Sequence, residues 1–512
     1  MTTTSDHTSI TTLRRWLGFG VLVLTVLLIV IDGTVLAMAI PFISQDLGAT
    51  STQMLWIGDV YSFVLAGLLV SMGTLGDRVG RKKLLLIGAG FFGAASLLAA
   101  YAPTAEMLIV ARALLGVAGA TLMPSTLSLI RALFPDPLQR RTAIGIWTAA
   151  TAGGGALGPL VGGVLLEHFW WGSVFLLNIP VVLLLIPAGA ALLPEAKNPD
   201  PGPWDLPSVG LSMIGMIGVV YTVKEAAANG FHLSVALAAA LGITALWLFV
   251  RRQQRLPRPL IDIDLFRNRA FSGVIGANML SVLGMAGLIY FISQYFQLVQ
   301  GYNPLKAGMA GLPSTIGAIA VSLLAGHLVA RTSSRSVLTA GLAIMGVALA
   351  PLVLLTPRTP YPVIAACLLL TGVGMAMAFT TANDIVLSSV RKEEAGAAAS
   401  ISETGYELGM ALGIATLGSV VMGIYQRFQV PAGTPDDLSA TAHDSLAGAV
   451  QASQQLPSAQ GQELLTAAQD AFTSGLATAA GVGALLLLTA ATLAWRLLKS
   501  LKTSENDTPA TH

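Results

Sequence analysis

The stretch "LLIVIDGTVLAMAIP" (Leu27–Pro41) places a carboxylate, Asp32, inside a run that is apolar from Trp16 to Ile40. A run of this length exceeds the roughly 7–15-residue apolar core of a signal peptide, so it predicts an uncleaved membrane-spanning helix. A charged side chain inside a span costs at least about 2.5–3.5 kcal/mol on insertion and normally faces a cavity or a partner. Asp32 is therefore the first candidate functional residue.

The composition of the whole chain supports the same interpretation. Of the 512 residues, 54% are hydrophobic and 11% are charged, and the mean hydropathy is +0.73. Ordinary soluble domains carry roughly 25% charged residues, so this composition predicts an all-α polytopic membrane protein. The single cysteine, Cys367, excludes an intrachain disulfide, and the six histidines form no metal-binding motif. The sequence also has no nucleotide-binding loop, so we expect a protein that is not an enzyme and that has no metal or cofactor.

Apolar runs of about 20 residues predict fourteen membrane-spanning helices. The runs lie near residues 16–41, 54–75, 84–101, 105–132, 140–163, 171–193, 206–226, 232–250, 270–298, 305–330, 336–356, 361–389, 395–424 and 475–498. With a cytoplasmic N-terminus, the cytoplasmic segments hold all 28 basic residues except Lys224, Lys306, Arg358, Arg427 and Arg112. This asymmetry follows the positive-inside rule, so we expect both termini in the cytoplasm.

The spans divide the chain into parts. We predict an N-terminal six-helix bundle in residues 1–200, two inserted helices in 201–258, a C-terminal six-helix bundle in 259–500 and a cytoplasmic tail in 501–512. The external segment 428–474 carries apolar residues at helical spacing, which predicts a helical hairpin. These residues are Leu438, Leu446, Val450, Leu464, Ala468 and Phe472. The hairpin either covers the outer mouth or binds a partner.

Two glycine-containing stretches adjoin or lie within spans. "GTLGDRVGRKKLL" (Gly73–Leu85) joins the second and third spans, and its glycines allow a tight turn in which Asp77 can cap a helix or pair with an arginine. "GGGALGPLVGG" (Gly153–Gly163) lies in the fifth span and lacks the ending of a phosphate-binding loop. It predicts a helix with a smooth face and a proline kink, suited to a close, sliding helix contact. "LIVARALLGVAGA" (Leu108–Ala120) places Arg112 inside the fourth span.

Together these stretches resemble the motifs of the major facilitator superfamily. Gly73–Leu85 is similar to its signature loop, Gly153–Gly163 to the antiporter motif of helix 5, and Arg112 to the arginine of the helix 4 motif. With fourteen spans, "IDGTVLAMAIP" and "WWGSVFLLNIP", the chain is identified as a member of the fourteen-helix drug:proton antiporters. These are the QacA-like, SmvA-like and LfrA-like multidrug and quaternary-ammonium efflux pumps. The resemblance covers about residues 14–500, but some relatives carry an acid in the tenth span, where this chain has His327.

The resemblance implies the major facilitator fold, in which two six-helix bundles rock around a midplane cavity, here with two inserted helices. It also implies that the two glycine-containing stretches govern this motion. The conformational gating residues would be Gly73, Asp77, Arg78, Gly80, Arg81, Gly154, Gly158, Pro159, Gly162 and Gly163.

Four acids and one base lie within the predicted spans. At about 1.5 Å per residue, Asp32 and Arg112 lie at similar heights and are able to pair, so we assign them to proton coupling. Glu403 and Glu407 lie one turn apart on one helix face, where two like charges cannot both be cheaply ionised. We assign Glu403 to proton coupling and Glu407 to substrate binding. Asp59 near a helix end is either a substrate ligand or simply hydrated.

Aromatic residues complete the candidate substrate site. Trp56, Tyr61, Tyr290 and Tyr295 either line a cation-binding cavity or form a lipid-facing belt. Asp384, near the inner end of its span, is expected to cap the helix or pair with Arg391.

These observations predict a proton-coupled antiporter of the bacterial cytoplasmic (inner) membrane. It would export lipophilic cationic drugs, dyes and quaternary ammonium antiseptics by alternating access and so confer antibiotic resistance. The alternative is a proton-coupled transporter of another small organic solute, such as a metabolite. The expected partners are cationic small molecules, protons and the lipid bilayer, with no nucleic acid, and the expected state is a monomer.

Overall fold

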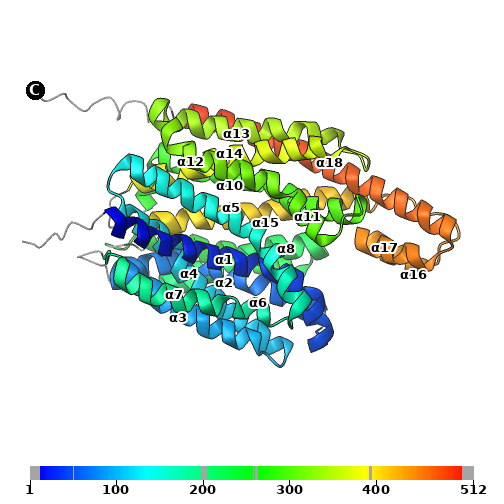
Figure 1. Ribbon diagram of the computed structural model, residues 1–512, viewed down its shortest axis with the longest axis horizontal. Coiled ribbons are helices and arrows are strands. Elements are labelled where there is room, and N and C mark those ends of the chain that lie inside the picture. The colour runs from blue at the N-terminus through cyan, green and yellow to red at the C-terminus, as the bar shows by residue number, and fades with distance from the viewer. Residues whose placement is uncertain are drawn as a thin grey trace, which may run out of the picture.

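The computed structural model describes residues 12–49, 51–197, 205–257, 259, 263–390 and 395–498. Within these ranges the chain forms helices and connecting turns (Figure 1). The chain ends that are described, the start of α1 and the end of α18, lie at one end of the elongated bundle, which we call the terminal end. Helices α16 and α17 protrude at the opposite end.

The helices follow the predicted order. The first group is α1 (Thr12–Leu47), α2 (Ser51–Val79), α3 (Arg81–Ala100), α4 (Ala105–Leu133), α5 (Pro137–His168), α6 (Ser173–Leu176) and α7 (Asn178–Leu192). Next come α8 (Leu206–Asn229) and α9 (Leu233–Gln253). The last group is η1 (Ile263–Arg267), α10 (Arg269–Gln294), η2 (Tyr295–Val299), α11 (Pro304–Ala310), α12 (Leu312–Arg331), α13 (Ser334–Leu349), η3 (Ala350–Leu354), α14 (Tyr361–Ser388), α15 (Ala395–Tyr425), α16 (Asp436–Asp444), α17 (Leu446–Gln455) and α18 (Ser458–Leu497).

Candidate membrane spans can be counted in the described part of the chain. Among the described residues, twelve helices are long and apolar enough to cross a membrane. Helix α2 is bent by 54° between Val60–Leu69 and Ser71–Val79, and it is a thirteenth if the bent pair is one span. The chain is thus a multi-pass membrane protein, but the predicted fourteen spans are not confirmed.

Local sequence signals explain where several helices begin. Thr104 and Asp136 accept hydrogen bonds from backbone N–H groups in the first turns of α4 and α5, at 3.3 and 2.8 Å. Asn303 does the same for α11, at 2.8 Å from Lys306 N. Proline follows both Asp136 and Asn303, where its missing N–H costs nothing. These caps fix where α4, α5 and α11 begin.

The hydrophobic core falls into two large clusters. One is built from α1–α7, and its members include Leu22, Phe92 and Trp147. The other is built mainly from α10–α18, and its members include Phe271 and Leu342. The first cluster also takes in side chains of α14 and α15, so these two helices form part of the seam between the two clusters. Helices α8 and α9 pack on each other, and α8 also contacts α2 and α15.

The predicted loop between the second and third spans is almost entirely helical. Helix α2 continues to Val79, and only Gly80 separates it from α3. Gly80 has φ +114°, a conformation that favours glycine, and a Cβ there would lie 2.6 Å from a carboxylate oxygen of Glu195. Asp77 forms an ion pair with the buried Arg81. The expectation that Asp77 pairs with an arginine is therefore met, but the connection is a one-residue turn and not the predicted loop.

The glycines of α5 bring it close to α1. A Cβ at Gly158 would lie 1.9 Å from Thr34 Oγ1, and a Cβ at Gly154 would lie 3.1 Å from Val30. Gly155 and Gly163 face open space. The glycines at positions 154 and 158, one helical turn apart, therefore form the smooth contact face. The side chain of Pro159 lies outside the described part of the chain.

A helical hairpin is present in the predicted segment, but its second arm differs from the expected one. Leu446 of α17 is buried, as are Leu464, Ala468 and Phe472 of α18. Helix α18, however, runs without a break from Ser458 to Leu497, so the second arm is the extended start of the last membrane helix and not a separate short helix. The hairpin is also held by the Tyr425 hydroxyl, which donates to Ala442 O at 2.6 Å.

Candidate functional site

A buried polar network surrounds Asp32. Arg112 Nη1 donates to Asp32 Oδ2 at 3.1 Å, and Asn178 Nδ2 donates to Asp32 Oδ1 at 2.7 Å. The same Asn178 nitrogen lies 3.0 Å from Ser96 Oγ. All four side chains are buried. Helices α1, α3, α4 and α7 thus supply one residue each to a closed site, and both carboxylate oxygens accept hydrogen bonds.

Arg112 is fixed on two further sides. Its Nε donates to the backbone oxygen of Ile57 at 3.2 Å, and its guanidinium lies over the Tyr61 ring, 4.6 Å from the centroid. A cation over an aromatic face is attracted by the ring's quadrupole. The sequence predicted the contact of Asp32 with Arg112 but assigned no role to Asn178. The available signal was a lone asparagine in the apolar stretch "WWGSVFLLNIP".

The second acidic site lies on α15. Glu403 is 3% exposed, and its Oε1 has no hydrogen-bond partner among the residues that the structure describes. Glu407 is partly buried and interacts electrostatically with Glu403, and also with Tyr61 of α2. Because α15 contacts both α2 and α4, the two acidic sites lie on neighbouring helices across the seam.

The other predicted substrate residues differ in their exposure. Trp56 and Tyr290 are 40% and 52% exposed, respectively. Tyr295 is fully buried, and its hydroxyl donates to Thr356 O at 2.7 Å. Its ring is therefore part of the packed core and not of a lipid-facing belt. The side chain of Asp59 lies outside the described residues.

Asp384 pairs with two arginines of α5. Arg140 Nε donates to Asp384 Oδ1 at 3.0 Å, and Arg141 Nε donates to Asp384 Oδ2 at 2.9 Å. Arg131 donates to the backbone oxygens of Leu387 and Val390. The sequence did not predict these partners. Arg391 lies outside the described residues, so the expected pair of Asp384 with Arg391 stays a prediction.

These contacts, which we call the α14 clasp, join the two core clusters at the terminal end. Its members are Arg131, Arg140, Arg141, Asp384, Leu387 and Val390. Deeper in the seam, the rings of Trp147 and Phe379 stack at 6.2 Å, and Thr380 Oγ1 donates to Thr148 Oγ1 at 3.2 Å. The seam is therefore closed at this end.

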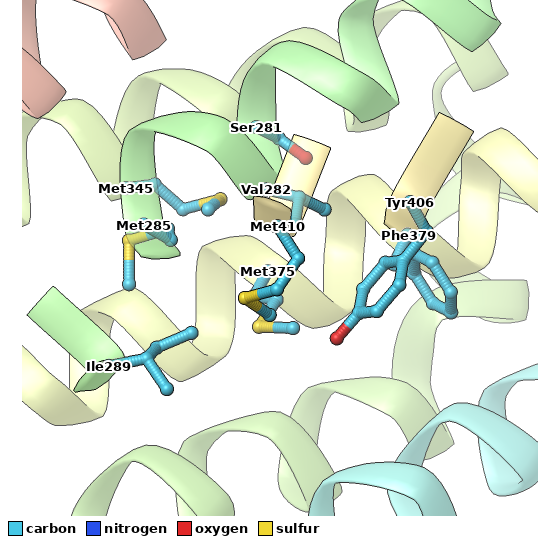
Figure 2. Close-up of a pocket in the computed structure, with 9 residues that line it drawn as sticks. All are labelled: Ser281, Val282, Met285, Ile289, Met345, Met375, Phe379, Tyr406 and Met410. Carbon is cyan, nitrogen blue, oxygen red and sulfur yellow. The ribbon is translucent and has the colours of Figure 1, made fainter. Parts of the chain in front are cut away.

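A small pocket lies among α10, α13, α14 and α15 (Figure 2). It is lined by Ser281, Val282, Met285, Ile289, Met345, Met375, Phe379, Tyr406 and Met410. Phe379 and Tyr406 meet edge to face, 5.6 Å apart. Tyr406 precedes Glu407 in α15, so the pocket adjoins the acidic site.

Comparison with known proteins gives consistent matches. The family model described as Major Facilitator Superfamily matches residues 22–414. Multidrug efflux pump LfrA of Mycolicibacterium smegmatis is 46% identical over 492 residues, which cover 95% of this chain and 97% of that protein. Methyl viologen resistance protein SmvA of Salmonella typhimurium is 37% identical over 493 residues, covering 95% and 99%. Puromycin resistance protein pur8 of Streptomyces alboniger is 33% identical over 500 residues, covering 97% and 93%.

Two solved structures share the fold. The proton:xylose symporter XylE has a TM-score of 0.62 at 14% identity, over 95% of this chain and 96% of that chain. The human organic anion transporter MFSD10 has a TM-score of 0.60 at 12% identity, over 92% and 99%. At these identities the likeness concerns the fold alone.

Proposed function

The chain belongs to the Major Facilitator Superfamily, and on that premise we propose that it is a proton-coupled antiporter that exports lipophilic cationic drugs, dyes and quaternary ammonium compounds. The observation that carries the proposal is the placement of a buried, charge-paired Asp32 next to the acidic residues of α15 across the seam. The efflux and resistance names of the three relatives support it.

The proposed setting is the cytoplasmic membrane of a bacterium, where the protein acts as a monomer with both termini inside. Under this proposal the N-terminal bundle ends near residue 200, and α8 and α9 form an inserted pair that ends near residue 258. The contacts of α8 with both α2 and α15 support the insertion, because a pair placed there packs against the helices of both clusters. The terminal end is then the cytoplasmic end.

The hydrogen bonds around Asp32 suggest how a proton is held. In this structure both carboxylate oxygens accept from N–H groups, which suits an ionised carboxylate. A protonated Asp32 needs an acceptor for its O–H. The Oδ1 atom of Asn178 is buried and has no partner in the described part of the chain. Rotation of the Asn178 amide brings this oxygen to the protonated carboxyl, so Asn178 serves both protonation states.

Tyr61 provides a physical link between proton and substrate. While Asp32 is ionised it holds Arg112, and in this scheme the negative charge of Glu407 attracts a cation. Protonation of Asp32 removes that attraction, and Arg112, already against the Tyr61 ring, is drawn toward Glu407. A cation at Glu407 then meets a competing positive charge and is released. Glu403, one turn away, takes part in proton exchange in this scheme.

The conformational roles of the glycine-containing stretches form part of the same proposal. The close α1–α5 contact at Gly154 and Gly158 supports a sliding role, because a side chain there would separate the helices. The Asp77–Arg81 pair and the turn at Gly80 support a switch role for the α2–α3 connection. Arg78, Gly73, Gly162 and Gly163 are assigned to gating by their place in the same stretches.

The decisive test of the proposed function uses inverted vesicles without ATP. An acid-inside pH gradient is expected to drive accumulation of ethidium, because each entering cation is exchanged for protons that leave the lumen. A protonophore is expected to stop it, and vesicles without the protein provide the background. Accumulation that persists after the gradient has collapsed would show that proton antiport is wrong.

A second prediction concerns the role of Glu407 in substrate binding. Methyl viologen and 1-methyl-4-phenylpyridinium share a two-ring scaffold but carry two charges and one charge. Glu407→Gln is expected to weaken methyl viologen about tenfold and the monocation about threefold, because a dication gains from both carboxylates of the pair. Binding to the purified protein measures both affinities. The exposed Glu463→Gln on α18 is the matched control, and equal losses for the two ligands would reject the assignment.

A further inference from the structure

Helices α13 and α18 pack against each other and together present an apolar outer surface. They approach closely at Gly346, where a Cβ would lie 2.8 Å from Leu488 Cγ. Val347 of α13 and Leu485 and Leu488 of α18 are exposed. In a chain that spans a membrane, exposed side chains of this kind face the acyl chains of lipids. The surface formed by these two helices is therefore in contact with the bilayer.

An arginine and a tryptophan meet where this surface reaches the terminal end. The guanidinium carbon of Arg335 on α13 lies 3.7 Å from the ring centroid of Trp495 on α18. Trp495 is itself exposed, and it lies three residues before the last described residue of the chain. Exposed tryptophans prefer the interface between the acyl chains and the headgroups. The pair is thus placed at the depth of the lipid headgroups.

Arg335 lacks an anionic partner. Within the described part of the chain it forms no ion pair, and its Nε is buried without a hydrogen-bond partner. The side chain as a whole is partly buried, so the rest of the guanidinium reaches the surface. The hydroxyl of Thr339, one helical turn further along α13, is also buried without a partner in the described ranges. Because unpaired donors at such a place are costly, they indicate a site that an acceptor from outside the chain completes.

The surroundings of this pair are positively charged. Arg331 ends α12 directly before α13 begins, and Arg496 follows the tryptophan in α18; both are exposed. Helices α12 and α13 and residues 471–498 contain no aspartate or glutamate. Asp264 and Asp384, which lie on other helices, already pair with arginines. The local charge therefore favours an anion.

A second arginine of the same kind shows what an ordinary interfacial pair looks like. Arg251 lies over the ring of Trp247, 4.3 Å from the centroid, and both residues belong to α9. Arg251 is exposed, as expected of a long side chain that extends along its own helix toward water. Arg335 differs because it bridges two helices and buries its Nε. Arg251 is therefore a matched control for Arg335.

We propose that Arg335 and Trp495 form a binding site for one anionic phospholipid. The phosphate binds the guanidinium, for which its oxygens are well matched acceptors, and an acyl chain lies along α13 and α18. Gly346 follows Arg335 by eleven residues, about 16 Å along the helix, which is roughly half of a ~30 Å hydrocarbon core. The apolar surface thus has the length of one leaflet, whereas a free phosphate would make no use of it.

The test measures lipid binding to the full-length protein in detergent by native mass spectrometry. Phosphatidylglycerol is the anionic probe, and phosphatidylcholine, which carries the same phosphate without net charge, is its control. Arg335→Ala is expected to weaken phosphatidylglycerol about tenfold and phosphatidylcholine within about twofold, because a charge-assisted hydrogen bond is lost. Arg251→Ala should stay within about twofold for both lipids. Equal losses in Arg335→Ala and Arg251→Ala would overturn the inference, because they would indicate general attraction to a basic surface.

Two further measurements separate the possible causes. Arg335→Lys keeps the charge but loses the planar fork, so it is expected to weaken phosphatidylglycerol about threefold, and an unchanged affinity would contradict the site even if Arg335→Ala fails to fold. Phosphatidylglycerol should raise the unfolding temperature of the unmodified protein and of Arg251→Ala more than that of Arg335→Ala. Excess inorganic phosphate should leave the lipid bound. Displacement of the lipid by phosphate alone would assign the site to a free phosphate and reject the phospholipid.

Discussion

Asp32→Asn is expected to abolish gradient-driven export, with a fall of about 100-fold, the upper end of typical coupling between two ligands. The amide keeps the size of the carboxylate and its place between Arg112 and Asn178, but it cannot bind and release a proton. It also removes the charge that holds Arg112, so the guanidinium is permanently available to compete with a cation at Glu407. Export is measured as ethidium accumulation in inverted vesicles under an imposed pH gradient.

The matched control lies on the same helix. Asp46 is exposed and accepts a hydrogen bond from Trp171 Nε1 at 2.6 Å, so Asp46→Asn changes the same chemical group at a position outside the buried network. We expect it to retain near-normal export. Membrane yield and elution as a single species verify that Asp32→Asn folds. Export by Asp32→Asn within about twofold of the unmodified protein would mean that the proton is carried elsewhere.

The sequence alone predicted the ion pair of Asp32 with Arg112, because the depth of a residue in the membrane follows from its position along a spanning helix. At about 1.5 Å per residue, Asp32 and Arg112 were placed at one height, and burial leaves a charged residue few alternatives to a partner at that height. The same argument failed for Asn178. An amide in an apolar run carries no charge, so neither the positive-inside rule nor the cost of burying ions draws attention to it.

The sequence could not predict side-chain contacts between segments that lie far apart along the chain. The residue expected to pair with Asp384 was Arg391, seven residues away, but Arg140 and Arg141, 244 and 243 residues away, also bind it. The packing of α14 against α5 brings these groups together.

The sequence also could not predict which way an aromatic side chain faces. Tyr295 was expected either to line a cavity or to lie in a lipid-facing belt. Its ring is fully buried, and its hydroxyl donates to Thr356 O.

The second prediction with a large expected effect concerns the α14 clasp. Asp384→Asn leaves Arg140 and Arg141 next to a neutral amide, and removing one partner from a mostly buried ion pair typically costs about 3 kcal/mol. Because the clasp exists only when the seam is closed at the terminal end, that loss shifts the ratio of closed to open molecules by roughly 100-fold. Asp264→Asn, in an exposed pair with Arg267, is the control and should change the ratio little.

The seam can be monitored through one engineered cysteine. Cys367 is the only cysteine of the chain. In a Cys367→Ala background, the cysteine introduced by Thr380→Cys is therefore the only thiol that a reagent can label. Thr380 is buried against Thr148 across the seam, and a thiol there reacts with a maleimide only when the seam opens. Asp384→Asn is expected to raise the labelling rate strongly in inverted vesicles. An unchanged rate would show that the clasp does not hold the closed state.

Export and labelling should change in opposite directions. Alternating access requires both the closed and the open seam, so a protein held open at the terminal end binds its cation but rarely completes the cycle. A misfolded variant also loses export, but its labelling would not depend on the substrate. In Asp384→Asn, a bound aromatic cation that favours the closed seam should still slow the labelling of Thr380→Cys. Slow export, fast labelling and protection by substrate together identify a shifted equilibrium, because local unfolding at the clasp would expose the thiol whether or not the cation is bound.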